Sequence, residues 1–181
     1  KMENIAEIIK PENEIERTIA ENEEFIRGCF YGKPRRGHPE GQVIFHIREV
    51  LDNVNKYGTS ENKKDLRLIG FVHDTFKFKV DQTKPKSGEN HHGFFARKFV
   101  ETYTSNIKIH EIVELHDEGY LSWQKGNRKG WAAGEERARV LIERLNRTGS
   151  LELYLTFYRC DNETGDKLRD NFEWFSGLAS K

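Results

Sequence analysis

Apolar residues recur at helical spacing along most of this chain, and no segment alternates convincingly between apolar and polar residues. In residues 42–57 the apolar positions are Val43, Ile47, Val50, Leu51 and Val54. A helix places residues three, four and seven apart on one face, so this spacing predicts an amphipathic helix. A half-buried strand would instead alternate with a period of two. The pattern therefore predicts an all-α fold.

The other expected elements follow from the same spacing and from runs of Gly, Pro and charge. Helices are predicted over residues 3–10, 13–27, 42–57, 62–75, 91–104, 107–117, 132–146, 150–161 and 165–177. Loops are predicted over 31–41, 79–88 and the basic, aromatic segment 119–131. The length of 181 residues suits one globular unit. We expect an N-terminal helical extension, residues 1–30, packed on a single domain, residues 31–181.

The composition excludes several classes of protein. The 30 Lys and Arg residues balance 30 Asp and Glu residues, so general nucleic-acid binding is not expected. No apolar run approaches the roughly 18 residues that a membrane span needs. The two cysteines, Cys29 and Cys160, form neither a CxxC pair nor a zinc-finger pattern, which indicates a reducing compartment. A cytoplasmic protein without a membrane segment is expected.

Several ionisable residues share the apolar faces of different predicted helices. His46 lies three residues after Val43 and four before Val50, and His73 lies four after Ile69. The same phase applies to His92, His116 and Asp161. An unpaired polar group in a protein interior costs roughly 1–3 kcal/mol, and an isolated charge far more. A divalent metal ion would be a common partner, because imidazole nitrogens and carboxylate oxygens are metal ligands.

Five short segments carry these histidines and acidic residues in a fixed order. They are HPEGQVIFHIREVLDNV (residues 38–54), HDTFK (73–77), HHGFFARKF (91–99), IVELHDEG (112–119) and YRCDN (158–162). Together they resemble the HD-domain superfamily of metal-dependent phosphohydrolases. The first is similar to the opening helix of the HD domains attached to bacterial tRNA nucleotidyltransferases, and the second has the HDxxK form. The resemblance implies an HD-domain-like helical bundle with a metal site between core helices.

The resemblance also implies a set of ligands. It assigns a first metal ion to His46, His73, Asp74 and Asp161. Asp74 would bridge to a second ion held by His116 and by either His91 or His92. The family's spacing to Ala96 favours His91, whereas helical phase favours His92, and of the two His91 is the expected ligand. The implied cofactor is one or two divalent transition-metal ions, with Fe, Mn, Zn, Co and Ni as candidates and Mg also open.

The predicted reaction is hydrolysis of a phosphate ester or anhydride by a metal-activated hydroxide. Asp74 and Lys77 are the predicted catalytic residues. Asp74 would orient the hydroxide, and Lys77, one helical turn after His73, would neutralise charge on phosphate oxygens. The predicted substrate-binding residues are Arg35, Arg36, His38, Lys77 and Lys79. Their positive charge suits a small phosphorylated substrate, and a nucleotide is the first choice because residues 123–131 combine basic and aromatic side chains.

Two other function classes stay open. One is a histidine-rich di-iron oxygenase of the HD fold, and the other is a non-catalytic nucleotide-sensing module. The acidic N-terminal helices also keep three roles open: they pack on the domain, shield the site, or pair two copies in a homodimer.

Overall fold

The computed structural model describes residues 4–181. Within that range the structure consists of helices and connecting loops, with no β-strand, which confirms the predicted all-α class. The α-helices are α1 (Ile5–Ile9), α2 (Glu14–Ala20), α3 (Glu23–Cys29), α4 (Val43–Tyr57), α5 (Lys63–Val72), α6 (His92–Val100), α7 (Ile107–Leu115), α8 (Glu118–Lys129), α9 (Trp131–Arg147), α10 (Leu151–Asn162) and α11 (Asp170–Ala179). Two short 3-10 helices, η1 (Lys77–Lys79) and η2 (Gly88–Asn90), lie between α5 and α6. In the described part of the chain, no helix has the length and apolarity to cross a membrane.

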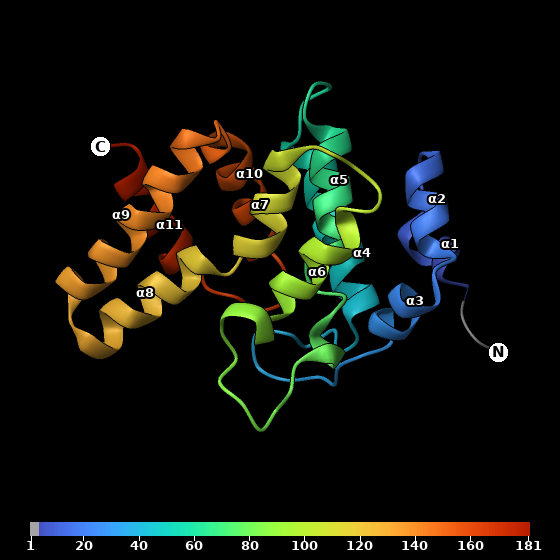
Figure 1. Cartoon of the computed structure of the whole chain (residues 1–181), viewed down its shortest axis with the longest axis horizontal. Helices are drawn as coiled ribbons and strands as arrows, with labels where there is room; N and C mark the ends of the chain where they lie inside the picture. The colour runs from blue at the N-terminus through green and yellow to red at the C-terminus, as the bar shows by residue number, and fades with distance from the viewer. Residues whose placement is uncertain (1–3) are drawn as a thin grey trace.

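Helices α4 and α5 lie at the centre of the molecule and pack against each other and against α10 (Figure 1). The short helices α1 to α3 lie at one end, where α1 packs on α4. Helices α8, α9 and α11 form a group at the opposite end, with α7 between that group and α5. The arrangement places the ends of α5, α7 and α10 near one another.

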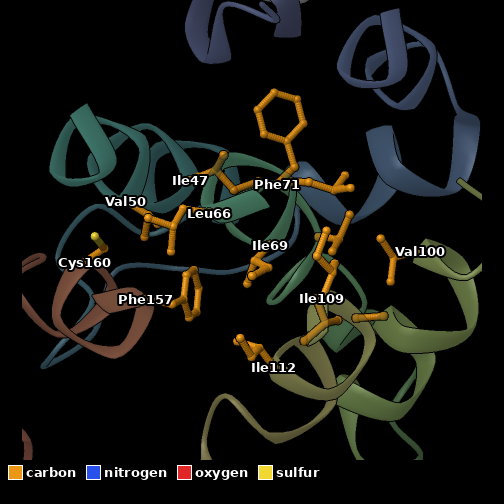
Figure 2. Packing of buried hydrophobic residues seen from close by; sticks show 14 of the residues in the cluster. Ile47, Val50, Leu66, Ile69, Phe71, Val100, Ile109, Ile112, Phe157 and Cys160 are labelled. Atoms are coloured by element: carbon orange, nitrogen blue, oxygen red, sulfur yellow. The ribbon is translucent and has the colours of Figure 1, made fainter. Parts of the chain in front are cut away.

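One hydrophobic core connects these helices. Figure 2 shows Ile47 of α4, Ile69 of α5, Ile112 of α7 and Phe157 of α10, all of them buried. The N-terminal helices contribute Ile9, Ile19 and Phe25 to the same core. The apolar stripes that the sequence predicts are therefore the buried faces. Histidines that lie in phase with those stripes are brought into the interior.

A buried ion pair ties α2 to α5. Arg67 Nε donates to Glu16 Oε1 at 2.9 Å, and its Nη2 donates to Glu16 Oε2 at 2.8 Å. Both side chains are almost completely buried. Arg67 Nη2 also donates to the carbonyl of Lys10 at 3.1 Å, so one guanidinium holds two segments of the N-terminal extension on the central helix.

Removal of one partner of this pair is expected to destabilise the fold strongly. Glu16→Ala leaves the Arg67 charge buried without its main counter-ion, which costs about 3–5 kcal/mol. Glu14→Ala, at an exposed position of the same helix, should cost under about 1 kcal/mol. Urea unfolding followed by circular dichroism measures both. Equal losses in the two variants would contradict the role of the pair.

The predicted loop over residues 119–131 is wrong, because residues 118–129 form α8. Its glycines mark a close helix contact. A Cβ added at Gly134 of α9 would lie 2.7 Å from the Cα of Gly126 in α8, so the two backbones approach where neither has a side chain. Gly130, with φ of 98°, makes the turn between them. A local pattern of glycines cannot distinguish a loop from such a packed hairpin.

Several other predicted helices differ in extent. The predicted helix 91–104 ends at Val100, and the predicted helix 62–75 ends at Val72. The predicted helix 13–27 is two helices, because the Asn22 side chain accepts the N–H groups of Glu24 and Phe25 and begins α3. The predicted helix 165–177 begins later, at Asp170, and residues 163–169 form a loop. The first predicted helix, 3–10, starts outside the described residues and otherwise corresponds to α1.

A matched pair of Gly→Ala variants tests the α8–α9 contact. Gly134→Ala should destabilise the protein by about 1–3 kcal/mol, because the new methyl group meets backbone atoms. Gly177→Ala, in α11 where nothing lies within 4 Å of the added Cβ, should be neutral or stabilise by up to about 1 kcal/mol. Thermal unfolding compares the two. The contact is refuted if Gly134→Ala is as stable as Gly177→Ala.

Candidate metal centre

The first cluster, defined here as His46, His73, Asp74 and Asp161, joins α4, the end of α5 and α10. His46 Nε2 lies 3.0 Å from Asp161 Oδ1 and 3.2 Å from His73 Nε2. Asp74 Oδ2 lies 3.6 Å from His46 Nε2 and 3.8 Å from His73 Nε2. The structure thus brings together the four residues that the sequence predicts for one metal ion.

The second cluster, defined as Asp74, His92 and His116, shares its carboxylate with the first. Asp74 Oδ1 lies 3.2 Å from His92 Nε2 and 3.3 Å from His116 Nε2. The two imidazole nitrogens are 3.0 Å apart. Asp74 therefore presents Oδ2 to the first cluster and Oδ1 to the second.

Of the two neighbouring histidines, His92 enters the second cluster and His91 lies beside it. His91 is the N-cap of α6, and its Nδ1 accepts the N–H of Gly93 at 3.0 Å. Its Nε2 faces Asp117, with 3.5 Å to Oδ2. Helical phase, which favours His92, agrees with this placement, whereas the spacing to Ala96 does not.

A tight turn after α5 positions the His73–Asp74 pair. His73 is the C-cap of α5, and its Nδ1 donates to the carbonyl of Gly70 at 3.0 Å. The next residue, Thr75, packs under α3 at Gly28. A Cβ at Gly28 would lie 1.8 Å from the Thr75 carbonyl oxygen, so only glycine allows this approach.

The other ligands are held by equally local contacts. His116 is the C-cap of α7, and its Nδ1 donates to the carbonyl of Val113 at 2.8 Å. Asp161 lies near the end of α10, where the Asn53 amide of α4 donates to the Cys160 carbonyl at 2.8 Å. Each contact fixes an imidazole tautomer or a helix end, as the outer contacts of metal ligands commonly do.

The protonation of His46 decides which donors of the first cluster face one another. His73 donates from Nδ1, so its Nε2 carries a lone pair. If His46 is protonated on Nδ1, its Nε2 lone pair faces that of His73. If it is protonated on Nε2, its Nδ1 lone pair faces the Glu40 carboxylate at 3.4 Å. Protonation of His46 on both nitrogens removes the conflict in the metal-free protein: burial and Lys167 oppose it, but Asp161 and Glu40 outweigh them and raise the pKa of His46. A divalent cation between the donors would remove it as well, and ligands about 2.0–2.2 Å from one ion lie roughly 3–3.5 Å apart. His46, His73 and Asp161 form one group that could hold a metal ion, and Asp74, His92 and His116 form another.

Burial and counter-charges set opposite protonation states in neighbouring imidazoles. Burial lowers the pKa of His73 to about 3 and that of His92 to about 4, so both are neutral near pH 7. Burial also opposes the charging of His116, but Asp117 and Asp74 outweigh it and raise its pKa to about 9. A proton on His116 thus supplies positive charge where the second cluster would hold a metal ion.

Two lysines offset the carboxylates of the first cluster. Burial alone would raise the pKa of Asp74 and Asp161, but Lys77 and Lys167 respectively, together with the neighbouring imidazoles, outweigh it and hold both well below their usual range. Lys77 Nζ pairs with Asp74 Oδ2, and Lys167 Nζ lies 2.9 Å from Asp161 Oδ1. Both lysine side chains remain about one-fifth exposed, at 22% and 19%, so they reach from the cluster to solvent.

The structure separates the other predicted substrate-binding residues. Arg35 and Arg36 are exposed in a tight turn, which an antiparallel bridge between Arg35 and His38 closes. His38 follows this turn next to the first cluster, with 5.4 Å between its ring and that of His46. Lys79 pairs with Glu24 of α3 at 2.6 Å, so it is not brought into either cluster.

Three residues at the clusters carry no site prediction from the sequence: Glu40, Asp117 and Lys167. Glu40 Oε1 accepts a hydrogen bond from His38 Nδ1 at 2.9 Å. The other oxygen, Oε2, is buried and has no hydrogen-bond partner among the described residues. Asp117 could have been found from the sequence, because His116-Asp117 is a second histidine–aspartate pair like His73-Asp74. Glu40 and Lys167 lie in loops without periodicity, so no face could be assigned to them.

Comparison of the chain with protein-family models, with curated proteins and with solved structures finds no match. The fold and the site therefore define an all-α protein with two adjoining buried His–Asp clusters that could bind metal. The resemblance to the HD-domain superfamily stays a prediction from its motifs.

Metal binding at the second cluster is expected to strengthen as the pH rises. His116 holds a proton below its pKa of about 9, and an arriving ion must displace it from Nε2. The apparent affinity for Mn²⁺ should therefore rise by up to about tenfold per pH unit between about pH 6.5 and 8.5. Calorimetric titration of the metal-free protein at three pH values measures this. The same affinity at every pH would contradict it.

Proposed function

We propose that this chain is a metal-dependent phosphohydrolase of the HD-domain type, which cleaves a phosphate ester or anhydride of a small substrate. The position of Asp74 carries the proposal, because its two oxygens face two separate clusters of imidazoles. Paired cation sites that share a carboxylate suit the displacement of a phosphate group, since the attacking and leaving oxygens can each be stabilised. The ordered motifs of residues 38–162 support the same class.

The chain's own residues supply ligands, orientation and charge. A divalent cation held by the first cluster would lower the pKa of a water molecule and offset the charge of phosphate oxygens. Lys77 and Lys167 add positive charge on the solvent side of the cluster. Lys167 donates to Asp161 Oδ1 and to the Asp161 carbonyl, so one of its three N–H donors remains for an anionic substrate. Such charge-assisted hydrogen bonds are strong for phosphate.

The burial of the donors favours a small substrate. His46 and His73 are 2% and 0% exposed, which favours a substrate that presents a small terminal group, such as a phosphate, to the cluster. Helix α8 begins directly after Asp117 and presents Tyr120 stacked on Trp123, with 6.0 Å between the ring centroids. Tyr120 is 38% exposed and offers a face on which a nucleobase can stack. A nucleotide uses both features and is the proposed substrate class.

The di-iron oxygenase alternative uses the same imidazoles and carboxylates. The two lysines argue against it, because an oxygenase has no need for two ammonium groups on the carboxylates of one cluster. Consumption of dissolved oxygen by the iron-loaded protein, with no release of phosphate from any nucleotide, would favour the oxygenase.

A nucleotide panel with two variants tests the proposed function. Wild-type protein loaded with Mn²⁺, Co²⁺ or Zn²⁺ should release phosphate or pyrophosphate from at least one nucleoside mono-, di- or triphosphate. Asp74→Ala should lose both metal and turnover. Lys77→Ala should keep the metal and slow the reaction by about 10²–10³-fold, because one group that stabilises phosphate charge is lost.

Lys98→Ala serves as the control, because Lys98 lies on α6 with a side chain that is 60% exposed. Its turnover should equal that of the wild type. Full activity of Asp74→Ala, or no release from any nucleotide with any of the three metals, would contradict the proposal.

A further inference from the structure

The second cluster has a neighbouring carboxylate that the predicted ligand set does not include. Asp117 Oδ2 lies 3.4 Å from His92 Nε2, and Asp117 Oδ1 lies 3.5 Å from His116 Nε2. These separations match those within the first cluster, where Asp74 Oδ2 lies 3.6 Å and 3.8 Å from two imidazole nitrogens. Asp117 therefore presents one oxygen to each of the two imidazoles, and it also forms a group with His91 and His92 that could hold a metal ion.

His116 and Asp117 also repeat the local structure of His73 and Asp74. Each histidine is the C-cap of its helix, with φ and ψ of −55° and −32° for His116 and −53° and −40° for His73. Each donates from Nδ1 to the carbonyl three residues earlier and turns Nε2 inward. In each pair the aspartate follows at once. The chain thus contains two His–Asp pairs of the same geometry, one for each cluster.

His91 faces the Asp117 carboxylate. Its Nδ1 accepts the N–H of Gly93, so the neutral ring carries its proton on Nε2. This Nε2 lies 3.5 Å from Asp117 Oδ2. A proton donor on one carboxylate oxygen leaves the other free, as in the outer contacts that commonly orient metal ligands.

We propose that Asp117 is the fourth ligand of the second cluster and that the chain consequently holds two resident divalent metal ions. This inference rests on the metal centre of the proposed function. The two clusters then have the same donor set: two imidazoles, the shared Asp74, and one carboxylate that belongs to that cluster alone. This last carboxylate is Asp161 in the first cluster and Asp117 in the second. Once an ion has displaced the proton of His116, two carboxylates and two neutral imidazoles form a site for a resident ion rather than for one that arrives with the substrate.

Counting ions in the wild type and three variants tests this inference. The proteins are stripped with a chelator, loaded with Mn²⁺ and passed through a gel-filtration column in metal-free buffer, and the retained ions are counted by elemental analysis. The wild type should retain two ions per chain. Asp117→Asn should retain one and bind the second about 10–100-fold more weakly, and Asp161→Asn should lose the other ion.

Glu118→Gln is the matched control, because Glu118 is the next residue and pairs with Arg137 of α9. It should retain two ions. Retention of two ions by Asp117→Asn would overturn the inference and leave the proposed function standing. A single retained ion in the wild type would also overturn it, whether or not the variants fold. Failure of the proposed function has a different signature, since two retained ions without turnover on any nucleotide would refute only the hydrolase.

Discussion

The buried carboxylate of Asp74 is the constraint on which the rest of the site depends. An ionised carboxylate in a protein interior is stable only when opposite charge and hydrogen-bond donors surround it. Lys77 and the imidazoles of two clusters provide that surrounding, and Gly28 lets the turn that carries Asp74 pack against α3. Helices α4, α5, α6, α7 and α10 each bring a residue to this carboxylate or to its cluster partners. The geometry of the clusters therefore depends on how these central helices pack together.

Much of the fold follows from helical periodicity. The stripe predicted over residues 42–57 is α4, Val43–Tyr57, because its apolar residues are spaced for one face and no glycine interrupts it. The α8–α9 hairpin could not be predicted in this way. Gly126 and Gly134 resemble loop residues locally, and only their contact in three dimensions explains them. The split between α2 and α3 depends on a single side-chain cap at Asn22, which competes with continued helix at little cost.

The residues of the site differ in the same way in how far the sequence predicts them. Residues on apolar helix faces, such as His46 and His116, could be placed in the interior because a regular helix fixes their direction. Loop residues could not. Lys167 reaches the first cluster because residues 163–169 pack on the loop 31–41, where Asp166 Oδ1 accepts the N–H of Gly37 at 2.6 Å. This contact joins residues that are 129 positions apart, and neither loop has a period. The functional interpretation beyond metal binding depends on motif resemblance and on the charges around the clusters.

Anomalous scattering from crystals grown with Mn²⁺ is the most direct test of the central claim that these side chains converge on shared cations. The account predicts two strong anomalous peaks on opposite sides of the Asp74 carboxylate, one beside Nε2 of His46 and His73 and one beside Nε2 of His92 and His116. Maps with no peak near Asp74, and with the imidazoles turned away from one another, would contradict it.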